Sequence, residues 1–166
     1  RPEFWLKDGE SAEVVFLDKE SFNIHVHQLK VRGKLRKYTC RRRGCPLCRI
    51  DEPRILSVYR IVDLRQFEKK GGKKGALSNY KQKYYEAGSR IQPAIAKLMD
   101  RGALYKKVAE ISRAGAGQQT TYTIIPIGAI EDDLRAALKK KGLLTPELDI
   151  ETDYAPKSAE DLATLV

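Results

Sequence analysis

Apolar and polar residues alternate in several short stretches of the chain, a period that is typical of half-buried β-strands. The clearest stretch is residues 22–28, in which three apolar side chains share one face and His25 and His27 share the other. Residues 11–17 and 54–67 are also predicted to be strands, because they are rich in Val, Ile, Leu, Phe and Tyr. Further strands are expected at residues 4–6, which an Asp-Gly turn joins to the next strand, and at residues 103–112 and 118–127.

Helical signals are confined to three segments. Residues 88–102 carry apolar side chains at helical spacing, with Pro93 near the first turn and Gly102 at the end. Residues 129–141 begin with acidic side chains and end with lysines, an order that complements the helix dipole. A short helix is expected after Ser158, which has an aspartate three positions later as a capping partner.

The three cysteines of the chain all lie within nine residues, and the second and third form a C-x2-C pair. Together with one upstream histidine they supply three thiolates and one imidazole, a complete tetrahedral set for zinc. Either His25 or His27 can provide the imidazole, and we expect His27. The predicted ligands of one structural zinc ion per chain are therefore His27, Cys40, Cys45 and Cys48. Four protein ligands leave no open position for a catalytic water.

A catalytic zinc site of the deaminase type is not supported by the sequence. Those enzymes carry H-x-E followed by P-C-x-x-C, and the glutamate moves the proton. Here the sequence is His25-Val-His27 with no glutamate, and a third cysteine is expected at the coordination position that a catalytic water would need. Phosphate-binding P-loop and Rossmann fingerprints are also absent from the sequence. We therefore expect a binding protein and not an enzyme.

These elements predict a mainly β fold with a few helices, because strands do not alternate regularly with helices. An oligonucleotide-binding (OB) barrel with an inserted zinc-binding loop is the expected architecture. Residues 1–127 are predicted to form this core and residues 128–166 a helical and acidic C-terminal region. Residues 68–75, rich in Gly and Lys, are expected to be a flexible cationic connection that either folds over a bound strand or is merely solvated.

The net charge of +10 is unevenly distributed along the chain. Residues 1–126 hold 27 basic and 13 acidic side chains, whereas residues 127–166 hold 5 and 9. Such a field attracts polyanions, most simply nucleic acid, and the acidic end is suited to protein partners. No apolar run is long enough for a membrane span, so we expect a soluble, cytoplasmic protein without a membrane partner.

Sequence-independent binding of a single strand needs basic side chains for the phosphates and aromatic faces for the bases. The arginines of the zinc loop are favoured because neighbouring metal ligands would fix their backbone. The alternative for each tyrosine is a half-buried barrel residue, and Trp5, Phe16 and Phe22 are expected in the core. Asp63 is expected to be a structural partner of the nearby arginines. The candidate basic contacts are Arg41, Arg42, Arg43, Arg60, Arg65, Lys81, Lys83 and Lys106. The tyrosines interleaved with lysines, Tyr80, Tyr84, Tyr85 and Tyr105, are the candidate stacking residues.

The motif His-x12-Cys-x4-Cys-Pro-x-Cys, together with the apolar segment 56–63 and the Tyr/Lys-rich segment 80–91, resembles the zinc-containing single-stranded DNA-binding proteins of bacteriophages. The resemblance covers residues 4–127, although the spacing between the first two cysteines is shorter than in the T-even members. It implies an OB fold and cooperative binding of single-stranded DNA in replication, recombination and repair, in the cytoplasm of a bacterial host. It also implies replication or recombination proteins as partners of the acidic C-terminal region, and favours Tyr84 and Tyr105 as cleft aromatics. The basic N-terminal arm of that family is not seen in this sequence.

Two other functions are compatible with the same residues. A zinc-ribbon module for RNA or duplex DNA would use the zinc loop and its arginines as the recognition surface. A protein-interaction scaffold would instead present the basic face to an acidic protein. The first predicts strong sequence dependence of binding, and the second predicts no binding of nucleic acid at low salt.

Overall fold

The computed structural model describes residues 1–68, 77–78 and 80–166. Apart from Glu68, the cationic connection predicted at residues 68–75 lies outside the described residues. The strands are β1 (Ser11–Phe16), β2 (Phe22–Val31), β3 (Lys34–Thr39), β4 (Arg54–Asp63), β5 (Phe67–Glu68), β6 (Leu77–Ser78), β7 (Lys81–Ala87), β8 (Lys107–Ala114) and β9 (Thr121–Ala129). The helices are α1 (Gln92–Asp100), α2 (Asp132–Lys140), α3 (Ile150–Asp153) and α4 (Ala159–Ala163), with short 3-10 turns η1 (Pro46–Arg49) and η2 (Gly117–Gln119).

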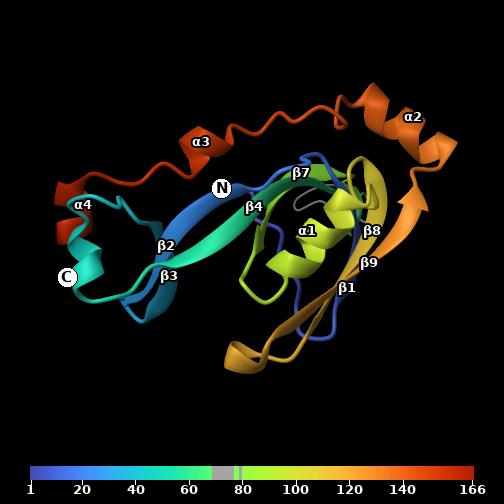
Figure 1. Cartoon of the computed structure of the whole chain (residues 1–166). Helices are drawn as coiled ribbons and strands as arrows, with labels where there is room; N and C mark the ends of the chain where they lie inside the picture. Colours follow the sequence, from blue (N-terminus) through green and yellow to red (C-terminus); the bar gives the residue numbers. More distant parts are fainter. Residues whose placement is uncertain (69–76, 79) are drawn as a thin grey trace.

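One antiparallel sheet dominates the molecule (Figure 1). Its strands follow the order β3-β2-β4-β1-β8-β9, and β7 pairs with the other side of β4. The N-terminal residues extend the sheet beyond β7, because Phe4 N donates to Tyr84 O and Tyr84 N donates to Pro2 O, both at 2.8 Å. No described strand joins β9 to β7, so the sheet is open. The mainly β class with few helices is confirmed, but the closed OB barrel is not.

The observed elements match most of the predicted ones with shifted ends. The helix predicted at 88–102 begins only at Gln92, and the helix predicted at 129–141 spans α2. Ser158 caps α4 as expected, since its hydroxyl accepts a hydrogen bond from Asp161 N at 3.1 Å. The strands β3 and β7 were not predicted, and the strand predicted at residues 4–6 is not formed. The alternation pattern misses β3 because this strand is strongly basic and none of its side chains is fully buried.

The main core lies between β1, β4, β7, β8 and α1, and Phe16 is fully buried in it, as predicted. Phe22 is only partly buried against a second cluster. The prediction that Trp5 belongs to the core is wrong, because 58% of its surface is exposed. Residues 4–6 alternate in direction, so burial of Phe4 and Leu6 turns Trp5 toward solvent.

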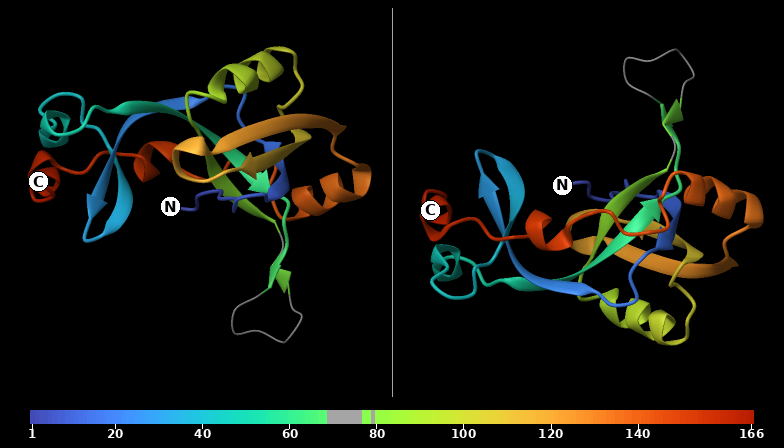
Figure 2. Two further views of the ribbon diagram at one scale, coloured as in Figure 1. Left: turned by 90° about the horizontal axis from the view of Figure 1, so that it is seen from below. Right: turned by 90° about the horizontal axis from the view of Figure 1, so that it is seen from above.

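Residues 142–166 form a segment that we call the C-terminal strap. Figure 1 shows it running from α2 at one end of the sheet to α4 beside the cysteine loop at the other. It is fastened to β7 by Gln82, whose amide donates to Leu143 O and Thr145 O at 3.1 and 2.7 Å. At its end, Leu162 is fully buried against Leu47 in a cluster that includes two of the cysteines. The strap therefore links the sheet to the cysteine loop (Figure 2).

Among the described residues, no helix combines the length and the apolar character that crossing a bilayer would require.

Candidate metal centre and nucleic-acid interface

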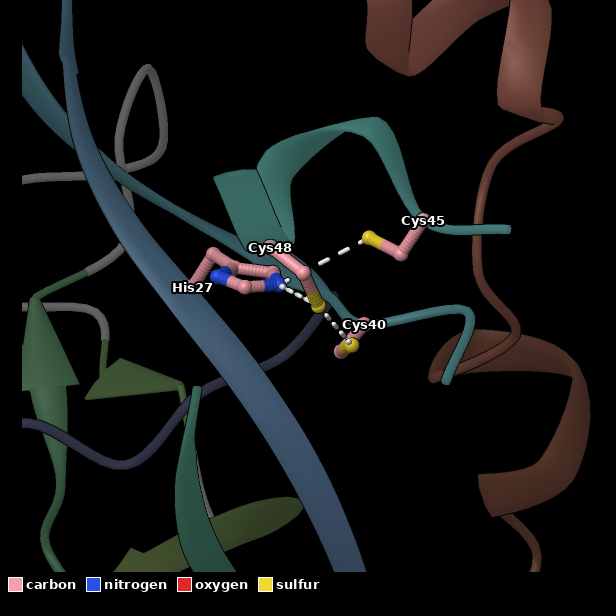
Figure 3. A group of neighbouring side chains, drawn as sticks. All are labelled: His27, Cys40, Cys45 and Cys48. Carbon is pink, nitrogen blue, oxygen red and sulfur yellow. Dashed lines mark hydrogen bonds between the residues drawn. The ribbon is translucent and has the colours of Figure 1, made fainter. Parts of the chain in front are cut away.

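The predicted metal ligands converge from three pieces of backbone (Figure 3). His27 comes from β2 and Cys40 follows the end of β3. Cys45 directly precedes η1, and Cys48 lies within it. Cys40 N donates to His25 O at 2.8 Å, which extends the pairing of β2 with β3 by one residue. Cys48 N donates to Cys45 O at 3.3 Å, which closes the turn of the C-x2-C pair.

The ligand atoms have the separations that a tetrahedral ion requires. Zinc bonds of about 2.3 Å to sulfur and about 2.0 Å to nitrogen place neighbouring ligand atoms about 3.5 to 3.8 Å apart. Nε2 of His27 lies 3.6 Å from Sγ of both Cys45 and Cys48, and Sγ of Cys40 lies 3.5 Å from Sγ of Cys48. All four ligand atoms lie within 4.8 Å of one another. The group can hold one metal ion, and its chemistry is consistent with structural zinc.

The structure decides between the two histidines that the sequence left open. The ring of His27 is fully buried in the cluster, whereas His25 lies outside it, partly exposed. Nδ1 of His27 lies 2.9 Å from Oδ2 of Asp51, so the carboxylate selects the tautomer that leaves Nε2 free for a metal. Asp51 was missed in the sequence, although a carboxylate close to a ligand set is a usual partner of a metal-binding histidine.

The thiols of Cys45 and Cys48 differ in how readily they ionise. Burial opposes ionisation of Cys45, but hydrogen bonds from the backbone of Arg41 and Leu47 outweigh it and lower the pKa of Cys45 to about 7. Burial, together with Cys40 and Cys45, raises the pKa of Cys48 to about 11. Neighbouring thiolates repel one another, and a divalent cation would remove this repulsion. Binding of a metal to this group must therefore release protons.

Three of the predicted nucleic-acid contacts lie in the cysteine loop itself. Arg41, Arg42 and Arg43 are exposed, and Arg42 has a positive φ of 68°. The backbone N–H of Arg42 lies 3.3 Å from Sγ of Cys40, so the loop conformation is tied to the ligand set. Nη1 of Arg41 donates to Lys157 O of the strap at 3.0 Å.

Three of the predicted basic contacts, Arg60, Arg65 and Lys83, are engaged in ion pairs. Arg60 binds Asp18 through Nη2 at 2.7 Å. Arg65 and Lys83 both bind the buried carboxylate of Asp63, at 2.8 and 2.7 Å. The expected structural role of Asp63 beside Arg65 is thus confirmed, whereas the partner of Arg60 is a residue far away in sequence.

The remaining predicted contacts are divided between buried and accessible positions. Tyr84 is fully buried beneath the strap, where its hydroxyl donates to Asp153 and its ring packs edge-on against Tyr154 at 4.9 Å. Burial and the nearby Asp153 carboxylate raise the pKa of Tyr84. Tyr105 is partly exposed between the ammonium groups of Lys19 and Lys106, 5.0 and 5.5 Å from its ring centre. Lys81 and Lys106 are exposed.

One cleft in the described part of the chain was not predicted from the sequence. It has a volume of about 880 Å³ and lies between the start of β4, the turn before α1 and the start of β9. Ile55 and Tyr122 line it with 49% and 39% of their surfaces exposed, and Arg54 and Arg90 add two exposed guanidinium groups. A lone tyrosine in a strand rich in threonine and isoleucine is the signal that could have indicated it.

Searches of protein-family models, curated protein sequences and solved structures return no match to this chain. A functional assignment therefore rests on the geometry of the metal centre and of the cleft.

Proposed function

We propose that this protein binds single-stranded DNA without strong sequence preference, on an open OB-like sheet stiffened by one structural zinc ion. The cleft beside Tyr122 is the observation that carries this proposal. It combines an accessible aromatic face with Arg54 and Arg90, in a protein of net charge +10. Aromatic faces stack on bases of any identity and cations neutralise phosphates, so such a surface does not depend on sequence.

The size of the cleft suits unstacked nucleotides. Its volume of about 880 Å³ is at the upper end of the range for small-molecule pockets, roughly 300 to 1,000 Å³. Ile55, Leu56 and Ile91 provide apolar walls for bases, while Arg54 and Arg90 lie where phosphates can reach them. A duplex hides its base faces, so this surface favours a single strand.

The metal centre has a supporting role in this proposal. His27, Cys40, Cys45 and Cys48 would hold zinc, which cross-links the backbone of the loop and contributes folding energy. The loop presents Arg41, Arg42 and Arg43 on its outside. Holding their backbone in place lowers the entropy lost when these side chains contact phosphate.

The biological role that we propose is the one implied by the resemblance to the phage proteins, namely protection and organisation of single strands during replication, recombination and repair. The exposed acidic side chains Glu151, Glu160 and Asp161 of the strap are suited to contacts with replication or recombination proteins. Cooperative self-association on DNA belongs to the same proposal.

Binding of a fluorescent oligo-dT to variants of Tyr122 tests the proposal. Tyr122→Ala is expected to weaken binding by about 1–3 kcal/mol, the usual contribution of one stacked base. Tyr122→Phe keeps the aromatic face and is expected to retain most of the affinity. Equal affinity of the wild type, Tyr122→Ala and Tyr122→Phe would show that this cleft is not where DNA binds. Steep dependence of affinity on base sequence would favour the zinc-ribbon alternative.

A further inference from the structure

Two large aromatic side chains outside the cleft are unusually accessible. Trp5 and Phe67 have 58% and 40% of their surfaces exposed. They line a second, smaller cavity of about 280 Å³ together with Lys7, Arg65 and Lys83 and the carboxylates of Glu3 and Glu10. An exposed aromatic face beside cations can stack on a base while the cations contact its phosphate.

The cations of this cavity hold the ring of Phe67 in position. The guanidinium carbon of Arg65 lies 5.0 Å from the ring centre of Phe67, and Nζ of Lys83 lies 4.6 Å from it. Both cations are anchored below by the buried carboxylate of Asp63. Because Asp63 neutralises much of their charge, Arg65 and Lys83 act on Phe67 and not as free phosphate ligands. The exposed ammonium group of Lys7 is the cation left for a phosphate.

Arg113 lies next to Trp5, at the edge of this cavity. Its guanidinium carbon lies 6.0 Å from the ring centre of Trp5, and its Nη1 donates to Leu6 O at 2.6 Å. On the neighbouring strand, the residue opposite Arg113 is Tyr122, which lines the cleft. Nε of Arg113 is buried and has no hydrogen-bond partner among the described residues. Arg113 thus contacts the ring of Trp5 and is paired in the sheet with Tyr122, a residue of the cleft.

We propose that Trp5 and Phe67 form a second nucleobase-stacking site, which takes a base of the same single strand that occupies the cleft. This inference rests on the function proposed above and adds a position along the strand. Aromatic faces stack on a base of any identity. The charge around the site also favours a strand of phosphates, because cations outnumber carboxylates there. The cations are Lys7, Arg65, Lys83 and Arg113, and the carboxylates are Glu3, Glu10 and Asp63.

Trp5 is the only tryptophan of the chain, so its emission reports directly on this site. Oligo-dT carrying a fluorescent label is titrated with the protein at low salt, and anisotropy of the label and tryptophan emission are recorded together. Stacking on Trp5 is expected to quench the emission with the same midpoint as the rise in anisotropy. A rise in anisotropy with unchanged emission would overturn the second site and leave the cleft as the binding surface. No rise in anisotropy would overturn both proposals.

Variants separate stacking from an indirect change in emission. Trp5→Ala is expected to weaken binding about 5- to 140-fold, which corresponds to 1–3 kcal/mol per stacked base. Trp5→Phe is expected to keep most of the affinity, because it retains an aromatic face. Ile127→Ala, which truncates an exposed side chain on β9, is the matched control and is expected to bind like the wild type. Wild-type affinity of Trp5→Ala would overturn the inference.

Photochemical crosslinking tests the same contact in the unaltered protein. Oligo-dT in which thymine is replaced by bromouracil is irradiated in the complex, and the crosslinked peptides are identified by mass spectrometry. We expect crosslinks to the peptides that contain Trp5 and Phe67, in addition to the peptide that contains Tyr122. Crosslinks confined to the Tyr122 peptide would contradict the second site.

Discussion

Nδ1 of His27 lies 2.9 Å from Oδ2 of Asp51, and the opposite ring nitrogen lies 3.6 Å from two cysteine sulfurs. The carboxylate therefore acts on the metal centre through the histidine, by fixing its orientation and its tautomer. Asp51 lies two residues after the end of η1, so the same short loop supplies the two ligands Cys45 and Cys48 and the group that orients His27.

Asp51→Asn is expected to weaken zinc binding without removing a ligand. Loss of such a partner typically costs about 10- to 100-fold in metal affinity. Competition with a chromogenic chelator measures the effect. Glu52→Gln changes the neighbouring exposed carboxylate and is expected to bind zinc as tightly as the wild type. Equal affinities of both variants would show that Asp51 does not support the site.

Cys45→Ser is expected to abolish stoichiometric zinc binding and to loosen the end of the strap. Cys45 belongs to the buried cluster that contains Leu162, so disorder of the loop would expose this side chain. Elemental analysis gives the zinc content, and hydrogen exchange of residues 159–163 reports on the release of α4. One zinc per chain together with wild-type exchange would contradict the ligand assignment.

Leu162→Ala tests the docking of the strap independently of the metal. Leu162 is fully buried, and truncating a buried leucine usually costs about 2–5 kcal/mol. We expect a lower free energy of unfolding in urea, with zinc still bound. Val166→Ala alters an exposed side chain four residues later and is expected to have the stability of the wild type. Unchanged stability of Leu162→Ala would show that α4 is not packed against the loop.

The carboxylate of Asp63 is expected to make the free energy of unfolding depend on pH in the acid range. Burial would raise its pKa, but hydrogen bonds from Arg65 and Lys83 outweigh burial and hold it below the ordinary value. The unfolded chain therefore takes up this proton at a higher pH than the folded chain. The stabilisation is complete above the ordinary aspartate pKa of about 4 and is lost as pH falls from there through the folded value.

Asp63→Asn should therefore lower stability at neutral pH, by about 3–5 kcal/mol, because Arg65 and Lys83 lose a buried partner. The difference from the wild type should shrink as the pH is lowered. Urea unfolding at a series of pH values measures both effects, with Asp100→Asn at an exposed position as control. A constant difference at every pH would contradict the role of this carboxylate.

The metal ligands could be predicted from the sequence because their geometry is largely local. Cys45 and Cys48 are brought together by one turn, and a hairpin pairs His27 with Tyr38, two residues before Cys40. The mainly β class could be predicted in the same way, since alternation of apolar and polar residues reflects a sheet with one buried face. Such patterns depend on neighbours in sequence.

Contacts between distant segments could not be predicted in this way. The cleft unites the starts of β4 and β9 with the turn before α1, and nothing in any one segment specifies the others. Burial of Tyr84 depends on a strap that lies about 70 residues later, through Asp153. The ion pair of Arg60 with Asp18 likewise joins β4 to the distant connection between β1 and β2.

Binding of oligo-dT and of a duplex of the same length, each at several salt concentrations, tests the central claim most directly. If about five phosphates are neutralised, the logarithm of the binding constant for the single strand should fall with the logarithm of salt concentration with a slope of about −3.5. We expect the single strand to bind more tightly than the duplex at every salt concentration. Tighter binding of the duplex, or no binding of either at low salt, would contradict single-stranded DNA binding.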